Sequence, residues 1–136
     1  MAIETALRVE LTNRPGEFAK VTRQLADAGV NIRSVAGLTA RGVGVAEFLV
    51  DDLGKATQAL RQGGTAFQEV RVVVSPIPQE VIDQPGSMAR LAEALAGAGI
   101  NIESLYAAIG PEGQFQGVLG CSDPEKAEPL LASWGA

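Results

Sequence analysis

Histidine is absent from this 136-residue sequence, and cysteine occurs once, as Cys121. Without histidine, the chain lacks the commonest metal ligand and the commonest general base near neutral pH. A single cysteine cannot form a disulfide within the chain, and no Cys/His cluster suits zinc. The carboxylates are scattered and form no convincing catalytic pair. The sequence therefore predicts a protein that is not an enzyme and that uses no metal or cofactor.

Basic residues and long apolar runs are also scarce. Eleven Lys and Arg residues stand against 16 Asp and Glu, giving a net charge of −5, whereas nucleic-acid-binding proteins usually present a basic face. No apolar run approaches the roughly 20 residues of a membrane-spanning helix. The first residues lack the basic head and apolar run of a signal peptide. We therefore expect a cytoplasmic protein with neither nucleic acid nor membrane as a direct partner.

What the sequence does contain is an internal repeat. The stretch Asn13-Arg14-Pro15-Gly16, followed by Gly29-Val30-Asn31-Ile32, returns 70 residues later as Asp83-Gln84-Pro85-Gly86, followed by Gly99-Ile100-Asn101-Ile102. A fixed period of this kind marks a duplicated structural unit. We therefore predict two small domains, over residues 1–74 and 75–136. Units of this size bury modest cores and usually need support from a neighbouring unit or a second copy.

The spacing of apolar residues predicts the same elements in both repeats. In the first repeat we expect strands over residues 5–11, 30–35, 43–50 and 67–74, a helix from Pro15 to the Gly29 stop, and a helix capped by Asp52. In the second repeat we expect strands over 76–82, 100–108 and 115–121 and helices over 85–98 and 123–131. The order is the ferredoxin-like β-α-β-β-α-β plan of the α+β class, with antiparallel sheets and the helices on one face.

The second repeat ends before a fourth strand matching residues 67–74. Its first strand, over 76–82, would then lie at the edge of its sheet, where Pro76 and Pro78 are tolerated. We therefore expect the second unit to lack its fourth strand, and the resulting edge to stay exposed or to be covered by the partner unit.

The Pro-Gly opening of each repeat has the chemistry of a receptor for a zwitterion. A helix N-terminus offers unpaired amide donors and a partial positive charge to a carboxylate, and Gly16 has no side chain to block its approach. Asn13 has a side-chain oxygen for an ammonium group, and Asn31 can both donate and accept. These residue types also suit ordinary turns, in which Asn31 and Asn101 would bond only backbone.

At these residues the sequence resembles the ACT domain family, and the overall form resembles stand-alone tandem ACT proteins. The resemblance rests on Asn-Arg-Pro-Gly-Glu-Phe with Ala-Gly-Val-Asn-Ile, and on Asp-Gln-Pro-Gly-Ser-Met with Ala-Gly-Ile-Asn-Ile. It implies a regulatory module that binds an amino acid at interfaces between paired domains and transmits occupancy to an enzyme or regulator. The positions it implies for ligand contact are Asn13, Pro15, Gly16, Asn31, Ile32, Asp83, Pro85, Gly86, Asn101 and Ile102.

Some positions depart from this pattern. Some amino-acid-binding members of the family have a histidine two residues before the loop asparagine, where this chain has Leu11 and Val81, which argues against serine binding of that kind. Asp83 replaces the asparagine in the second copy, so the two sites need not be equivalent. Three apolar or aromatic residues are candidates for pocket lining or core packing, namely Phe18, Met88 and Tyr106.

Two alternatives stay open. A ligand-free interaction module would use exposed sheet edges for self-association, with Trp134 as a possible interface anchor. The segment Asn101-Ile102-Glu103-Ser104-Leu105 also resembles the small regulatory subunit of acetolactate synthase. We expect a homodimer, and a metabolic enzyme or a transcriptional regulator as the further partner.

Overall fold

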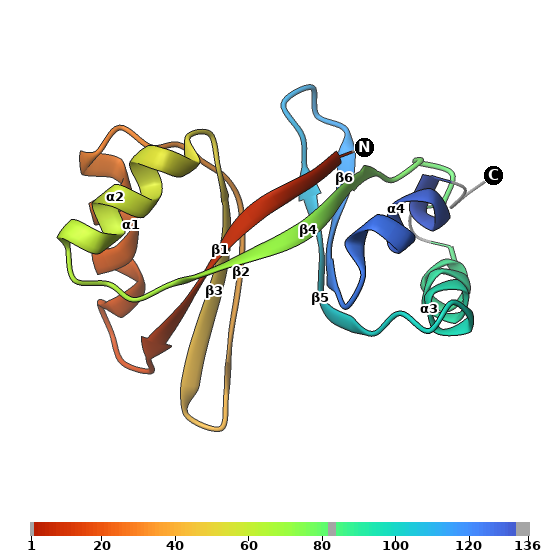
Figure 1. Cartoon of the computed structure of the whole chain (residues 1–136), viewed down its shortest axis with the longest axis horizontal. Coiled ribbons are helices and arrows are strands. Elements are labelled where there is room, and N and C mark those ends of the chain that lie inside the picture. Colours follow the sequence, from red (N-terminus) through yellow and green to blue (C-terminus); the bar gives the residue numbers. More distant parts are fainter. Residues whose placement is uncertain (1, 82–83, 133–136) are drawn as a thin grey trace. The chain divides into compact units, whose positions relative to one another are not determined.

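The computed structural model describes residues 2–81 and 84–132, and the chain divides into two compact units. The first unit is Thr5–Val70, and the second unit is Arg71–Ala136 together with Met1–Glu4. The division therefore falls four residues before the predicted boundary between residues 74 and 75, and the start of the chain joins the second unit. Each unit combines a β-sheet with two helices, as the α+β prediction requires (Figure 1).

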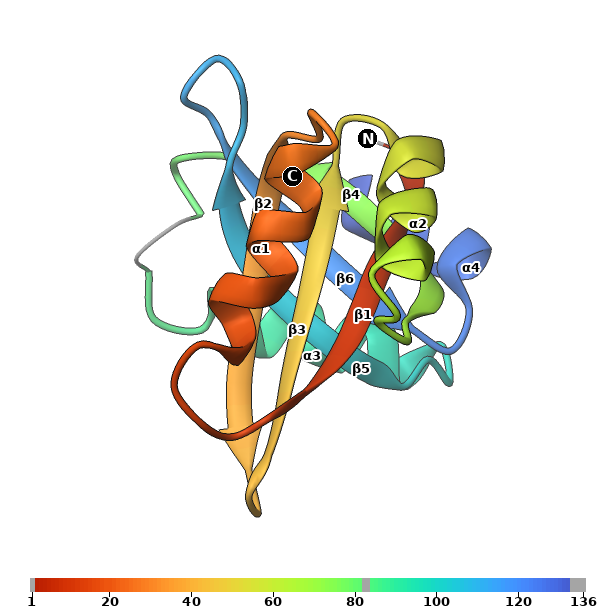
Figure 2. The same cartoon turned by 90° about the vertical axis from the view of Figure 1, so that its left-hand side faces the viewer.

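The first unit follows the predicted β-α-β-β-α-β order. Its elements are β1 (Ala2–Thr12), α1 (Glu17–Asp27), β2 (Ile32–Ala40), β3 (Val43–Val50), α2 (Leu53–Gln62) and the beginning of β4 (Gln68–Pro76). Strand β3 pairs antiparallel with both β1 and β2. Helices α1 and α2 lie side by side over one face of this sheet (Figure 2).

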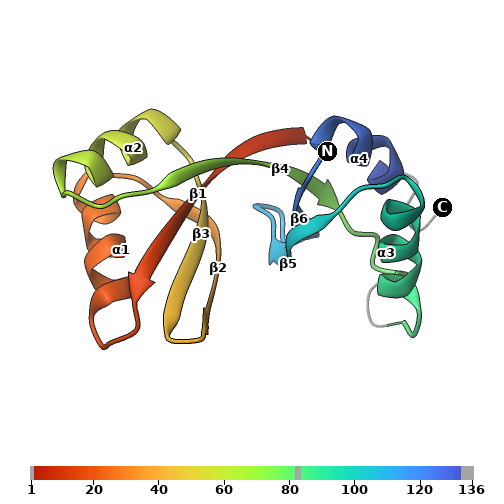
Figure 3. The same ribbon diagram turned by 60° about the horizontal axis from the view of Figure 1, so that its bottom comes forward.

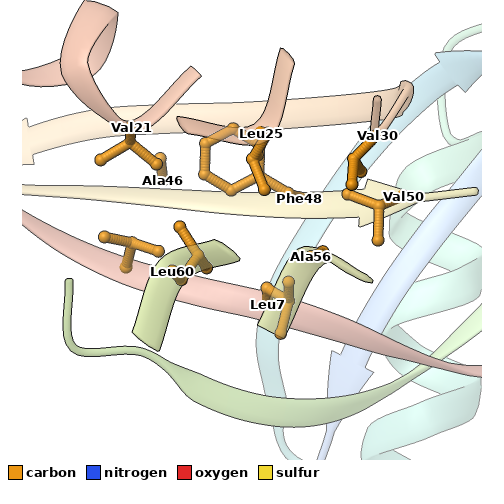
Figure 4. Packing of buried hydrophobic residues seen from close by; sticks show 10 residues of the cluster. Leu7, Val21, Leu25, Val30, Ala46, Phe48, Val50, Ala56 and Leu60 are labelled. Atoms are coloured by element: carbon orange, nitrogen blue, oxygen red, sulfur yellow. The ribbon is translucent and has the colours of Figure 1, made fainter. Parts of the chain in front are cut away.

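The core of the first unit lies between that sheet face and the two helices. Alternation along β1 points Leu7 and Val9 inward, where both are fully buried. Helical spacing brings Val21 and Leu25 of α1 onto the same cluster, which surrounds the buried Phe48 ring (Figure 4). Burying a side chain of this size contributes about 1.5–3 kcal/mol, so this cluster holds the helices on the sheet.

Local turn chemistry sets the limits of these elements. Helix α1 ends in a Schellman motif, in which the Val30 N–H donates to the Leu25 oxygen and the Gly29 N–H donates to the Ala26 oxygen, both at 3.0 Å. Ala40 pairs with Val43. The connection between the strands predicted over 30–35 and 43–50 is therefore a two-residue hairpin, and β2 extends five residues further than expected. Arg41 and Gly42 both have positive φ, as a type I′ turn requires.

The second unit contains α3 (Ser87–Gly97), β5 (Ile102–Ile109), β6 (Phe115–Cys121) and α4 (Pro124–Ala132). Helices α3 and α4 are shown in Figure 3. Its core gathers Val73 of β4, Leu91 and Leu95 of α3, and Leu119 and Cys121 of β6. None of the helices in the described ranges combines the length and apolar character needed to span a membrane.

The predicted strand over residues 76–82 is wrong. Residues 77–81 form a turn and irregular backbone, and residue 82 lies outside the described ranges. Strand β4 instead continues through Pro76, and its second half pairs antiparallel with β6 from Val72 to Pro76. Proline donates no backbone hydrogen bond, so a ladder is not readily continued through Pro76 and Pro78. The apolar residues before these prolines, in the second half of β4, form the first strand of the second unit instead.

That strand is not an open edge, because β1 lies beside it, so of the two expected outcomes the covered edge is the one found, and Pro78 lies outside any strand. The strand order is β2-β3-β1-β4-β6-β5, in which β4 has β6 on one side and β1 on the other. No strand follows α4 in the part of the chain that the structure describes. Residues 1–4 belong to the second unit, so the start of β1 takes the place where a fourth strand of the second repeat would lie.

Ile3 is the side chain that ties the start of β1 to the second core. We expect Ile3→Ala to lower the free energy of unfolding of the second unit by about 1–2 kcal/mol, below the range for fully buried isoleucines because Ile3 is only partly buried. Hydrogen exchange of β6 amides during urea titration measures this. Glu10→Ala, an exposed change on the same strand, should stay within about 0.5 kcal/mol of the parent. Equal protection of β6 in both variants would contradict the assignment.

Candidate functional site

Both Pro-Gly turns place a left-handed glycine at the start of a helix. Gly16, with φ 91°, is the N-cap of α1, and Gly86, with φ 89°, is the N-cap of α3. We predicted that Pro15 would be the first helical residue, but α1 begins two residues later. The reason is conformational, because a residue with positive φ cannot continue a right-handed helix and glycine adopts that φ without a Cβ penalty.

The two Pro-Gly helices differ from the others in how they begin. The side chains of Asp52 and Asp123 cap α2 and α4, accepting from the N–H groups of Lys55 at 3.0 Å and Lys126 at 3.1 Å. No side chain in the described ranges caps α1 or α3. The second and third amides of a helix have no acceptor inside it, so those of α1, Phe18 and Ala19, can donate to a ligand.

A pocket of about 410 Å³ opens beside the start of α1. It lies among the end of β1, the loop that follows, the first turn of α1 and the strands β2 and β3. Its lining includes Asn13, Arg14, Glu17, Phe18, Val35, Leu38 and Thr39. The Arg14 Nε donates to Glu17 Oε1 at 2.8 Å. The pocket thus presents a cation, an anion and an apolar wall within one lining.

Phe18 belongs to this wall and touches the core. Its ring stacks on the Phe48 ring with centroids 6.0 Å apart and planes 8° from parallel, while 46% of the residue stays exposed. The two roles considered for Phe18, core packing and pocket lining, therefore occur together. Met88 holds the equivalent place on α3 and is 53% exposed, and Tyr106 lies half-buried in β5.

Asn31 and Ile32 do not line the same pocket as Asn13. They border a hollow of about 760 Å³ along the outer side of α1. The Asn31 N–H donates to Asp51 Oδ1 at 2.9 Å, and the Asp51 N–H donates to the Asn31 oxygen at 3.0 Å. This backbone pair makes the turn, and Asn31 itself remains exposed. Pro15 and Gly16 form the turn that leads into α1, and they line neither the pocket beside Asn13 nor the hollow beside Asn31.

The second repeat reproduces the turn with different chemistry. The Asn101 N–H donates to Ser122 Oγ at 2.9 Å, and the Ser122 N–H donates to the Asn101 oxygen at 3.0 Å. Pro85 and Gly86 lead into α3, where Arg90 Nη2 donates to Ser87 Oγ at 3.2 Å, and Ile102 begins β5. Asp83 lies outside the described residues, as does Trp134.

Sequence reasoning missed Arg14 and Glu17 as site residues. Their spacing of three residues at a helix start was a usable signal, because such pairs face each other on a helix surface. The sequence also contains no signal for the β2 and β3 residues of the lining, such as Val35 and Thr39. These residues come close to the start of α1 only because the strands pair in the sheet.

Cys121 is 7% exposed within the second core, where it packs as a small buried residue. Burial raises the pKa of its thiol, which disfavours the reactive thiolate. Among the residues that the structure describes, no group of three or more Cys, Asp or Glu side chains could hold a metal ion.

Comparisons with known proteins match a family model to the first unit and solved structures to both units. The ACT domain family model matches residues 5–62. The chain is similar to protein BT0572 from Bacteroides thetaiotaomicron, with 25% identity over 96% of this chain and 87% of that one and a TM-score of 0.77. It is also similar to the regulatory subunit of aspartate kinase from Thermus thermophilus in its ligand-free form, with 18% identity over 99% and 96% and a TM-score of 0.68.

The regulatory subunit of aspartate kinase from Thermus flavus gives 19% identity over 99% of this chain and 96% of that one, with a TM-score of 0.70. No curated protein matches this sequence. The family match spans most of the first unit, and the structural likenesses extend over both units. The ACT domain family model thus matches residues 5–62, within the first unit, and the second unit repeats the same fold.

Proposed function

We propose that this chain is a non-catalytic regulatory protein that binds a free amino acid beside the start of α1. The observation that carries the proposal is the helix start without a side-chain cap, next to a pocket lined by both charge signs. Occupancy would pass to a partner enzyme or regulator. The shared fold with aspartate kinase regulatory subunits supports a regulatory role.

The pocket has complementary chemistry for each part of an amino acid. The open amide of Phe18 and the Arg14 guanidinium suit a carboxylate. The Glu17 carboxylate and the Asn13 side-chain oxygen suit an ammonium group. A volume of about 410 Å³ falls within the roughly 300–1,000 Å³ range of small-molecule sites.

The ion pair between Arg14 and Glu17 does not prevent this binding. The Arg14 side chain is 67% exposed and that of Glu17 is 25% exposed. Ion pairs of this kind contribute only about 0.2–1 kcal/mol, so a zwitterion can separate the two charges at small cost and pair with both.

The remaining predicted residues complete the proposal. Pro15 and Gly16 shape the turn that leaves the amides open, and Asn31 and Ile32 offer contacts from the outer side of α1. In the second repeat, the equivalent residues are Asp83, Pro85, Gly86, Asn101 and Ile102. There Ser87 replaces Glu17, so the second site lacks that carboxylate and should differ in ligand.

We also propose that the chain acts as a homodimer.

A thermal-shift screen of the twenty amino acids tests the proposal. A ligand that binds only the folded state at about 100 times its Kd adds roughly 2.7 kcal/mol, which corresponds to a rise in Tm of about 5–10 °C. We expect at least one amino acid to give such a rise and the rise to disappear in Arg14→Ala/Glu17→Ala. Lys55→Ala, an exposed change on α2, is the matched control and should keep it.

Two results would contradict the proposal. One is the absence of a shift with all twenty amino acids, which would favour the ligand-free interaction module. The other is an unchanged shift in the Arg14→Ala/Glu17→Ala variant. A separate variant, Asn31→Ala, tests the outer hollow, because the hydrogen bonds between Asn31 and Asp51 use the Asn31 backbone and survive this change.

A further inference from the structure

The pocket beside the start of α1 gathers most of the large apolar side chains that the first unit leaves exposed. Four such residues stay exposed among residues 5–70, and three of them line this pocket, namely Phe18, Val35 and Leu38. The fourth, Val43, begins β3. Single exposed apolar residues are ordinary, but several gathered in one concave site mark a place where an apolar group binds.

The sheet under this part of the pocket is built from small residues. Gly37 pairs with Ala46, and Thr39 pairs with Gly44, toward the end of the β2–β3 hairpin. Residues directly opposite each other on antiparallel strands point to the same face, and Ala46 belongs to the core under the helices. The hairpin continues past the first turn of α1 (Figure 2). These pairs add little side-chain bulk, so they leave room in the pocket.

The second unit has large side chains at the corresponding place. Counted from the register shift in each hairpin, the sixth pair is Thr39 with Gly44 in the first unit and Ile109 with Phe115 in the second. Ile109 and Phe115 are both exposed. Their bulk reduces the room beside the start of α3, so the recess over small residues is particular to the first unit.

The charges of the pocket match an amino acid's backbone groups and leave none for its side chain. Arg14 and Glu17 supply the charges of the described lining, and they suit the carboxylate and the ammonium group. A further charge on the ligand would have no partner of opposite sign, and burying an unpaired charge is costly. The other polar side chains of the lining, those of Thr12, Asn13 and Thr39, are neutral.

We propose that this pocket selects amino acids with a large apolar side chain, branched aliphatic or aromatic. The inference rests on the proposed function and names the class of ligand for the same site. The ligand's backbone groups bind at the start of α1, and its side chain lies over the small residues of the hairpin. Phe18 and Val35 form the apolar wall against that side chain. Amino acids with small or charged side chains bind weakly, because they bury little apolar surface or leave a charge unpaired.

Isothermal titration calorimetry of the full chain with matched ligands tests this selectivity. Leucine and asparagine have side chains of similar shape, as do valine and threonine, so each pair differs mainly in polarity. Burial of one methylene group strengthens binding by about fourfold. We expect at least one of leucine, isoleucine and phenylalanine to bind about tenfold or more tightly than asparagine, alanine, lysine and aspartate do. We also expect valine to bind more tightly than threonine.

The variant Val35→Thr tests where the ligand's side chain lies, because it replaces a methyl group of the wall with a hydroxyl group of similar size. We expect it to weaken binding of the preferred apolar amino acid by about fourfold. Val43→Thr is the matched control and should keep the parental affinity. Val43 is 47% exposed and Val35 is 41% exposed, but Val43 is not part of the pocket lining. Circular dichroism melting checks that both variants fold.

Three results would overturn this inference. If asparagine, lysine or aspartate bound as tightly as the apolar amino acids, the site would still bind amino acids but with another selectivity. If Val35→Thr and Val43→Thr changed the affinity equally, the ligand's side chain would not lie against this wall. If none of the twenty amino acids bound, the proposed function would fail together with the inference.

Discussion

Replacing Arg8 by methionine is expected to lower the free energy of unfolding by about 3–5 kcal/mol, because it would leave the Glu47 carboxylate buried without its cation. Arg8 and Glu47 stand directly opposite each other on β1 and β3. The distance from Arg8 Nη2 to Glu47 Oε1 is 2.8 Å, and that from Arg8 Nε to the same oxygen is 3.3 Å. Only 6% of the Glu47 side chain is exposed, against 26% for Arg8, so the guanidinium shields this carboxylate from water.

Urea unfolding followed by circular dichroism measures this loss. The double variant Arg8→Met/Glu47→Leu should recover most of it, since removing both partners of a buried pair is often nearly neutral. Arg14→Met is the matched control, because it removes the exposed ion pair with Glu17 and should cost no more than about 1 kcal/mol. A loss below about 1 kcal/mol for Arg8→Met would show that Glu47 is hydrated in solution.

Replacing Phe48 by alanine is expected to cost about 3–5 kcal/mol through lost burial and the cavity left behind. Phe48 is fully buried and belongs to the largest side chains of the first core. Helix α1 contacts this ring through Leu25 (Figure 4) and through the stacked Phe18 ring. The change therefore weakens both the core and the apolar wall of the pocket.

Denaturant midpoints and slopes measure the effect of Phe48→Ala. The control is Phe115→Ala on β6, where the residue is 40% exposed and the expected loss is about 1 kcal/mol. If the parent shows an amino-acid thermal shift, Phe48→Ala should reduce it more than Phe115→Ala does. Equal losses of stability in the two variants would contradict the assignment of the core.

The prediction of local structure around the candidate site succeeded where it depends on neighbouring residues. The repeated Pro-Gly turns do begin α1 and α3, and the Asp52 cap follows from a residue type and its position. The left-handed conformation of Gly16 was missed, because Pro-Gly is compatible with several turns and a helix can begin at either residue. The separation of Asn13 from Asn31 could not be predicted, since it depends on which side of α1 each loop passes.

The predicted bounds of strands were wrong where pairing with another strand decides where a strand ends. Nothing local distinguishes a strand over 76–82 from the continuation of β4 through Pro76, because both stretches contain apolar residues beside proline. Strand β4 gains its extra length by pairing with β6, whose residues lie forty or more positions later in the chain. The pairing of Arg8 with Glu47, 39 residues apart, was equally out of reach.

The amino-acid sequence by itself determined the duplication, the order of helices and strands and the turn chemistry at each helix start, because these depend on neighbours within a few residues. Only the tertiary structure decided that the start of the chain belongs with the second unit, that β4 serves both units, and that Arg14, Glu17 and Val35 meet in one pocket. The physical reason is that backbone hydrogen bonds and core contacts between strands join residues far apart in the chain, and a strand's own residues do not specify which partner it will meet.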